Sequence, residues 1–148
     1  MRGRRFLRPK PAKWRILIVD DHALVRRGLA ALIASEPDLV VCGEAATCRA
    51  ALEALEQNHP ELVIVDLVLG DEDGLDLDKK IKARHPELPS LVLSMHDESV
   101  YAERSLRAGA LGYVTKQELG EQVLVAIRCV LRSETYLSPR ISVGVDPA

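Results

Sequence analysis

From Arg15 onward, short apolar runs alternate with segments whose apolar residues recur every three to four positions. This alternation is typical of repeated strand–helix units, which build a parallel sheet covered by helices. Five runs fit buried strands, at residues 16–19, 39–42, 62–65, 91–93 and 111–114. Right-handed crossovers between them predict a doubly wound α/β sandwich of three layers with a parallel sheet in the order 2-1-3-4-5.

Five helical patterns accompany these strands. The first extends from Leu24 to Ile33 and stops at Pro37. The second begins after Thr47, a suitable N-cap residue, and ends before Pro60. The other three are expected at about 74–84, at 98–108 and from Leu119 to near Ser133.

Charge is distributed unevenly along the 148 residues. The first fifteen contain seven Lys/Arg and no acid, so residues 16–148 carry 13 basic and 22 acidic side chains, a net charge of −9. An acidic body argues against a nucleic-acid-binding surface on this domain. Residues 1–14 could contact phosphate weakly, but we interpret them as a basic, flexible arm.

The apolar segments also limit location and redox chemistry. No run approaches the roughly 20 residues needed to cross a bilayer, and no secretory signal follows the basic start, so we expect a cytoplasmic protein without membrane contact. Cys42, Cys48 and Cys129 lack metal-type spacing and lie in apolar segments, which predicts reduced core residues.

Polar side chains follow four of the five predicted strands. The first strand ends in Asp20 and Asp21, the third in Asp66, the fourth in Ser94, and Lys116 follows the fifth. Because the carboxyl ends of strands in an open α/β sheet face one crevice, we expect these side chains to converge.

The expected cluster suits phosphoryl transfer. Three carboxylates repel one another, and a hard divalent cation with oxygen ligands, most simply Mg²⁺, removes that repulsion. Asp66 could act as a nucleophile toward phosphorus if the cation and Lys116 neutralise the transferring oxygens. Each residue alone has a simpler interpretation, such as helix cap, turn or surface residue, but their joint placement favours a functional site.

Four segments, 16–29, 63–67, 94–97 and 108–116, resemble two-component receiver domains, and the similarity covers about residues 15–138. His22 after the Asp pair and the segment 136–139 are similar to the NarL/FixJ subgroup, whose members usually carry a C-terminal LuxR-type helix-turn-helix. The resemblance implies the flavodoxin-like receiver fold for residues 15–134.

The resemblance also implies a metal and a phosphoacceptor. Asp66 would accept a phosphoryl group from a sensor histidine kinase. Asp21 would ligate Mg²⁺ directly and Asp20 directly or through water, with Asp66 and the backbone carbonyl of Val68 as further ligands.

The remaining implied roles concern the conformational switch. Lys116 would contact the phosphoryl group, the hydroxyl of Ser94 would move toward it, and Tyr113 would turn inward to follow. This is a population shift biased by a covalent charge. Val68 and His96 are expected to flank the path of an attacking water and to tune the lifetime of the phosphoryl group.

The resemblance implies a signalling role whose output is produced in the full-length protein. The chain would signal rather than catalyse, apart from slow autodephosphorylation, and would control transcription in the full-length protein. No helix-turn-helix follows residue 139, so 135–148 are interpreted as the start of an interdomain linker, with DNA contact only through an absent output domain. A homodimer is plausible through 24–33 with 119–131, or through 98–108 with 119–131.

Several alternatives stay open. The chain could be a stand-alone or degenerate receiver that acts by protein–protein interaction. A haloacid-dehalogenase-like phosphatase is disfavoured because Val68 stands where that family needs a second acid. A calcium loop over 71–74 would require an oxygen ligand at Leu69 and Glu at Lys80.

Overall fold

The computed structural model describes residues 13–96, 98–118 and 120–139. Within them, one sheet has six strands: β1 (Trp14–Val19), β2 (Leu39–Ala45), β3 (Leu62–Asp66), β6 (Ser90–Ser94), β7 (Gly112–Thr115) and β8 (Tyr136–Leu137). Their order is β2-β1-β3-β6-β7-β8, and every pairing is parallel. The predicted order 2-1-3-4-5 is therefore confirmed, with β8 added beside the fifth strand.

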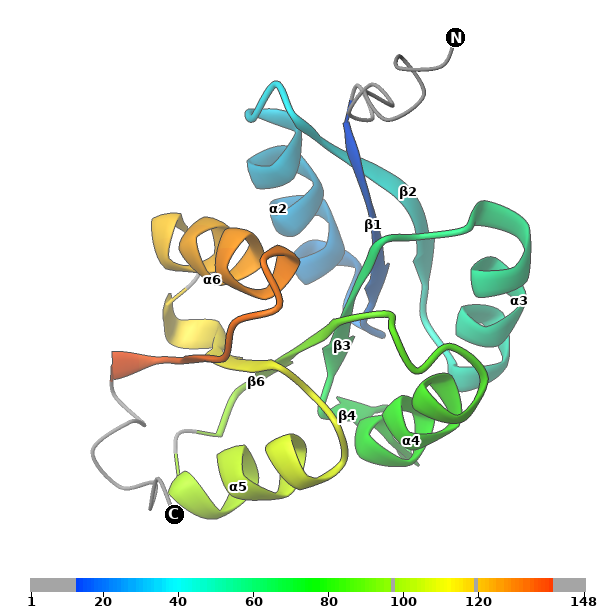
Figure 1. Cartoon of the computed structure of the whole chain (residues 1–148), viewed down its shortest axis with the longest axis vertical. Coiled ribbons are helices and arrows are strands. Elements are labelled where there is room, and N and C mark those ends of the chain that lie inside the picture. The colour runs from blue at the N-terminus through cyan, green and yellow to red at the C-terminus, as the bar shows by residue number, and fades with distance from the viewer. Residues whose placement is uncertain (1–12, 97, 119, 140–148) are drawn as a thin grey trace, which may run out of the picture.

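Helices cover both faces of this sheet. In the described part of the chain these are α2 (Ala23–Ala34), α3 (Cys48–Asn58), α4 (Gly74–Arg84), α5 (Ser99–Arg107) and α6 (Glu121–Leu131). Helices α2 and α6 lie on one side of the strands and α3 and α4 on the other (Figure 1), as a three-layer sandwich requires. Helix α6 begins later than predicted, and Leu119 lies outside the described residues.

Local signals explain where α3 begins and where α5 ends. The Thr47 hydroxyl accepts a hydrogen bond from the backbone N–H of Ala50 (3.1 Å), which confirms the predicted N-cap of α3. After α5, Gly109 has a φ of +111°, a conformation that side chains oppose and glycine permits. The chain can therefore turn sharply from α5 toward β7.

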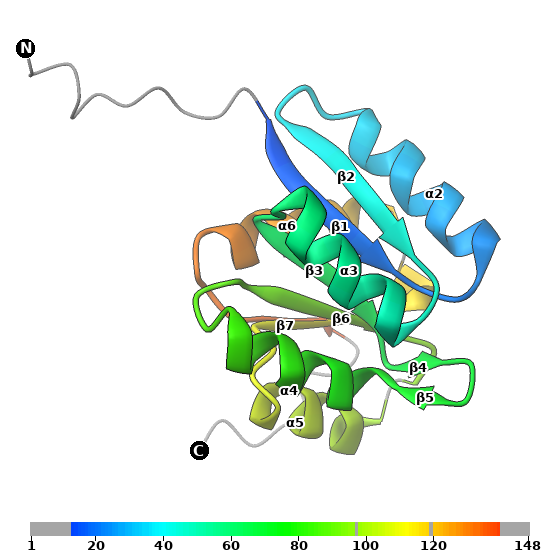
Figure 2. The same cartoon turned by 90° about the vertical axis from the view of Figure 1, so that its right-hand side faces the viewer.

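The core forms two layers because side chains of a strand alternate between its faces. On β1, Ile16 and Ile18 pack with α2 and α6, whereas Leu17 and Val19 pack with α3 and α4. All four are fully buried, and burying one such side chain contributes roughly 1.5–3 kcal/mol. Figure 2 shows β1 and β3 running between these helices.

Two features were not predicted. Strand β8 pairs with β7, and the hydroxyl of the buried Ser138 accepts from the backbone N–H of Thr115 (3.1 Å). The pair β4 (Val68–Leu69) and β5 (Glu72–Asp73) forms an antiparallel ribbon between β3 and α4. The interdomain linker beginning at residue 135 stays a prediction.

The prediction that the cysteines are core residues is wrong. Cys42, Cys48 and Cys129 are free thiols, as predicted, but they are only half-buried, and Cys42 and Cys48 lie at the margin of the apolar layer beneath α3 and α4. Burial raises the pKa of the Cys42 thiol, so this thiol stays protonated at neutral pH. Among the described residues, the helices are too short or too polar to cross a bilayer.

Candidate functional site

The residues singled out by the sequence meet at the carboxyl edge of the sheet. Asp66 and Ser94 end β3 and β6, while Asp20 and Lys116 directly follow β1 and β7. All four are buried. Asp66, Ser94 and Lys116 line a cavity of about 320 Å³. Its lining also includes Asp21, His22, Val68 and His96.

Lys116 bridges two strands. Its Nζ lies 2.9 Å from Asp66 Oδ2 and 3.0 Å from Asp20 Oδ2. Burial by itself would lower the pKa of Lys116, but the two carboxylates outweigh it and raise that pKa above its ordinary value. The ammonium therefore keeps its charge between the two acids.

One ammonium is not enough to balance the acids around it. Burial, together with the charge of Asp20, raises the pKa of Asp66, although Lys116 acts in the opposite direction. Asp66 Oδ1 accepts one long hydrogen bond, 3.3 Å, from the backbone N–H of Val68. The site consequently carries excess negative charge, with Asp66 only partly compensated.

The donor set fits a divalent cation. Ligand atoms of Asp20, Asp21, His22 and Asp66 all lie within 4.8 Å of one another. Asp20 Oδ2 is buried and, beyond its ion pair with Lys116, accepts no hydrogen bond of regular geometry from the described residues. Buried oxygens that lack donors and share surplus negative charge suit a hard cation such as Mg²⁺. The carbonyl of Val68 stays a predicted ligand.

His22 belongs to this site, although its sequence position indicated only a resemblance to the NarL/FixJ subgroup. Its Nδ1 lies 3.1 Å from Asp20 Oδ1, 3.3 Å from Asp21 Oδ1 and 3.9 Å from Asp66 Oδ2. His22, not Asp20 or Asp21, occupies the N-cap position of α2, so the helix-cap interpretation of the two acids is wrong. Adjacency to the Asp pair was the signal that could have identified it.

Arg26 is a second site residue that the sequence did not reveal. Its Nη1 donates a 2.6 Å hydrogen bond to the backbone carbonyl of Asp20, and its Nε pairs with Glu44 Oε1 at 3.1 Å. Glu44 lies on β2, so the guanidinium ties the segment that carries Asp20 to a strand of the sheet. We interpret Arg26 as a positioning residue.

The predicted switch residues are joined through one loop position. The hydroxyl of Ser94 accepts from the backbone N–H of His96 (3.0 Å), and the phenol of Tyr113 donates to the His96 carbonyl (2.6 Å). Tyr113 is fully buried, so it already faces inward in this structure. The His96 ring stacks on Tyr101, with ring centroids 4.4 Å apart.

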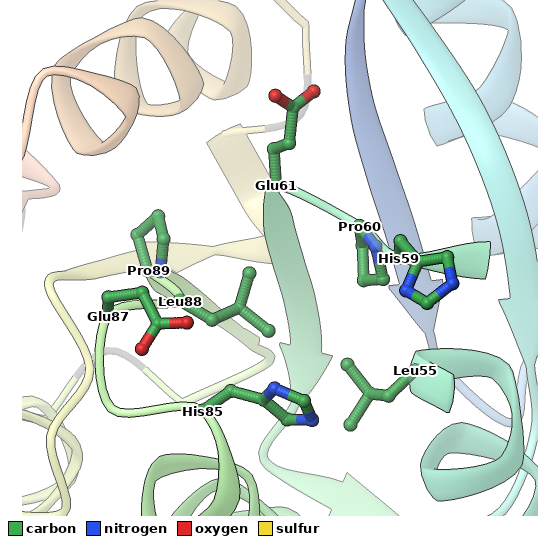
Figure 3. Close-up of a pocket in the computed structure, with 8 residues that line it drawn as sticks. All are labelled: Leu55, His59, Pro60, Glu61, His85, Glu87, Leu88 and Pro89. Carbon is green, nitrogen blue, oxygen red and sulfur yellow. The ribbon is translucent and has the colours of Figure 1, made fainter. Parts of the chain in front are cut away.

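A second cavity, of about 390 Å³, lies at the opposite edge of the sheet, beside the ends of α3 and α4. Figure 3 shows His85 and Leu55 pointing toward each other, while Glu61 points away from both. Its residues do not form a group of three metal-type donors, since among the described residues only the cluster around Asp66 does so. The chemistry therefore concentrates at the carboxyl edge.

Comparison with known proteins identifies the class that this fold and site define. The response regulator receiver domain matches residues 16–128, and the chain belongs to this family. It is a receiver domain of two-component response regulators, of the NarL/FixJ type that the sequence resembled.

Two curated response regulators show how similar the chain is to individual members of the family. The chain is 35% identical over 132 residues to the oxygen regulatory protein NreC of Staphylococcus carnosus, covering 88% of this chain and 61% of NreC. It is 33% identical over 128 residues to the response regulator GacA of Pseudomonas viridiflava, covering 86% of this chain and 60% of GacA. The chain thus spans about three-fifths of the length of these curated relatives.

Solved structures of response regulators share the fold of this chain. A two-component response regulator of the LuxR family from Aurantimonas sp. SI85-9A1 superposes with a TM-score of 0.86 at 32% identity, covering 90% of this chain and 95% of that one. The isolated receiver domain of RcsB from Salmonella enterica serovar Typhimurium, in the presence of the phosphomimetic BeF₃⁻, gives 0.83 at 25% identity, covering 90% and 99%. Both likenesses cover 90% of this chain.

Proposed function

We propose that Asp66 accepts a phosphoryl group from a sensor histidine kinase. The observation that carries this proposal is the Lys116 ammonium, 2.9 Å from Asp66 and 3.0 Å from Asp20. The Lys116 ammonium keeps a positive charge beside the carboxylate of Asp66, whose Oδ1 accepts a long hydrogen bond. The pair lies at the carboxyl edge of a parallel sheet, where ligands of such folds bind.

The transfer needs little beyond position and charge. The carboxylate of Asp66 forms a new O–P bond as the P–N bond of a phosphohistidine breaks, and the histidine nitrogen takes a proton from solvent. Among the described residues, Oδ1 of Asp66 accepts a hydrogen bond only from the Val68 N–H, at 3.3 Å, so we assign it as the attacking oxygen. Lys116 neutralises charge on the transferring group, in keeping with the electrostatic character of phosphoryl transfer.

Mg²⁺ is the cation we assign to this site. Asp20, Asp21 and Asp66 would hold it, together with the backbone carbonyl of Val68. When bound, it supplies positive charge for the phosphoryl oxygens. Without a cation, Asp20, Asp21 and Asp66 outnumber the single ammonium of Lys116.

The conformational response involves Ser94 and Tyr113. If the Ser94 hydroxyl moves toward the phosphoryl group, its 3.0 Å contact with the His96 N–H must break. Since Tyr113 holds the carbonyl of the same residue, the change is passed to β7 and from there to the face formed by α5, β7 and α6. A bistable loop biased by a new charge is the usual form of such switches.

Val68 and His96 are assigned to the lifetime of the phosphoryl group. Both line the acidic cavity, and Val68 is 48% exposed. A side chain at either position can block or orient water approaching Asp66. Replacing Val68 with Asn is expected to change the rate of dephosphorylation.

The output is proposed from the relatives. Brevibacillus brevis DegU is a transcriptional regulatory protein, and RcsB has been solved as two dimers bound to two parallel DNAs. We infer that this receiver controls transcription through an attached DNA-binding domain and can form a homodimer through α2 with α6 or through α5 with α6. A stand-alone receiver acting on a protein partner is the alternative.

The proposal is tested by incubating the chain with Mg²⁺ and acetyl phosphate, followed by intact mass measurement. Wild type should gain one phosphoryl group, Asp66→Asn none, and Lys116→Gln should react about 10²–10³-fold more slowly. The exposed carboxylate of Asp76 on α4 provides the matched control, and Asp76→Asn should behave as wild type. An unmodified wild type, or a phosphoryl group retained by Asp66→Asn, would contradict the proposal.

A further inference from the structure

The imidazole of His22 contacts the acidic cluster although much of its ring is exposed. Nδ1 lies 3.1 Å from an oxygen of Asp20, 3.3 Å from one of Asp21 and 3.9 Å from one of Asp66. The side chain is 61% exposed, so packing does not force this orientation. The ring nitrogen therefore lies among the same carboxylates that the proposed function assigns to a cation.

These distances match the spacing of ligands around one ion. Ligand bonds of about 2.1 Å in octahedral geometry separate adjacent ligand atoms by about 3 Å and opposite ones by about 4.2 Å. The distances of 3.1 and 3.3 Å fit adjacent ligands, and 3.9 Å lies near the value for opposite ligands. Because the four donor atoms lie within 4.8 Å of one another, side-chain shifts alone would bring an oxygen from each acid and Nδ1 to a common centre.

The backbone holds His22 in place. Its N–H donates a 2.8 Å hydrogen bond to Asp20 Oδ1, and Arg26 anchors the carbonyl of Asp20. His22 also stands at the N-cap position of α2, so the helix fixes the direction of the chain that follows. A ligand on such a preorganised segment loses little conformational freedom when it binds a metal.

We propose that His22 is a further metal ligand through Nδ1 and that it adds affinity for a transition-metal dication such as Mn²⁺ without changing the affinity of the site for Mg²⁺. The inference rests on the metal site of the proposed function. Imidazole suits transition metals, whereas Mg²⁺ prefers oxygen ligands. A ring that binds a metal through Nδ1 carries its hydrogen on Nε2, which faces away from the carboxylates only if the metal takes the place of the present contact between Nδ1 and Asp20.

The direct test is pulsed electron paramagnetic resonance on the Mn²⁺-loaded chain. Wild type should show hyperfine coupling to a directly bound ¹⁴N nucleus, and His22→Gln should not. The matched control is His96→Gln, because His96 lines the same cavity but is not in the cluster of metal-type donors. This variant should keep the coupling.

Affinity gives a second measurement. His22→Gln should weaken Mn²⁺ binding about tenfold while leaving Mg²⁺ binding little changed, as measured by titrating free Mn²⁺ and by Mg²⁺ competition. No ¹⁴N coupling in wild type, coupling that persists in His22→Gln, or an equal loss of both metals would overturn the inference. Thermal unfolding of the metal-free variant confirms that it folds.

Failure of this inference can be separated from failure of the proposed function. Acetyl phosphate labelling in Mg²⁺ reports on Asp66, whereas the ¹⁴N signal in Mn²⁺ reports only on His22. Labelling without a nitrogen signal leaves the receiver function intact and removes the role of His22. A nitrogen signal without labelling keeps the ligand and removes the phosphoacceptor.

Discussion

The phenol of Tyr113 donates a 2.6 Å hydrogen bond to the backbone carbonyl of His96, which links the middle of β7 to the loop that follows β6. The N–H of the same loop residue is bound to Ser94. The backbone N–H and C=O of His96 thus contact Ser94 and Tyr113, the two residues expected to act together in the switch. A movement of Ser94 would therefore disturb the residue that holds Tyr113, which explains how the two side chains can be coupled.

Tyr113→Phe should lower the free energy of unfolding by about 1 kcal/mol, because the partly buried His96 carbonyl loses a hydrogen-bond donor. Urea unfolding measures the change. Tyr101→Phe is the control, since Tyr101 contacts His96 through its ring, and its stability should change by less than about 0.5 kcal/mol. Equal stability of Tyr113→Phe and wild type would show that this hydrogen bond contributes nothing.

Arg26→Gln should reduce the affinity for Mg²⁺ about tenfold, because the carbonyl of Asp20 loses the guanidinium that holds it. Glu44→Gln removes the ion pair but keeps the contact with Asp20, so its effect should be smaller. Isothermal titration calorimetry distinguishes the two variants. If Arg26→Gln binds Mg²⁺ as tightly as wild type, Arg26 does not position the site.

Gly74→Ala should destabilise the fold by roughly 1–3 kcal/mol or more, because a Cβ there would lie 1.9 Å from the backbone oxygen of Asp66. The matched control is Gly28→Ala within α2, where a Cβ meets nothing within 4 Å. That change should stabilise the protein by about 0.5–1 kcal/mol. Thermal unfolding of both variants checks the prediction, and a stable Gly74→Ala would contradict the close approach.

Asp78→Asn should stabilise the protein at neutral pH. Burial raises the pKa of Asp78, and the Ser90 hydroxyl and the charge of Lys82 oppose this shift. Its Oδ1 accepts no hydrogen bond from the part of the chain that the structure describes. Because the folded-state pKa is the higher one, folding favours the protonated carboxyl, and ionisation costs stability as the pH rises through that pKa.

The advantage of Asp78→Asn should therefore disappear in acid, below the ordinary Asp pKa of 3.8. Urea unfolding of both proteins at several pH values measures it. A stability difference that is independent of pH would assign the effect to packing and not to the buried charge.

Much of the fold could be predicted because its signals are local. A wholly apolar run such as residues 62–65 indicates a strand buried on both faces, and Thr47 indicates where a helix begins. Strand β8 could not be predicted in this way, since Tyr136–Leu137 is too short to carry a pattern and depends on the open edge of β7.

Some residues of the candidate site could likewise be predicted from local signals, and others could not. The sequence by itself determined that Asp20, Asp66, Ser94 and Lys116 share one edge, because parallel strands place their carboxyl ends together. Only the tertiary structure decided that Nδ1 of His22 lies among the carboxylates. Strand topology sets which residues become neighbours, whereas ångström-scale contacts depend on backbone directions and rotamers that no pattern along the chain specifies.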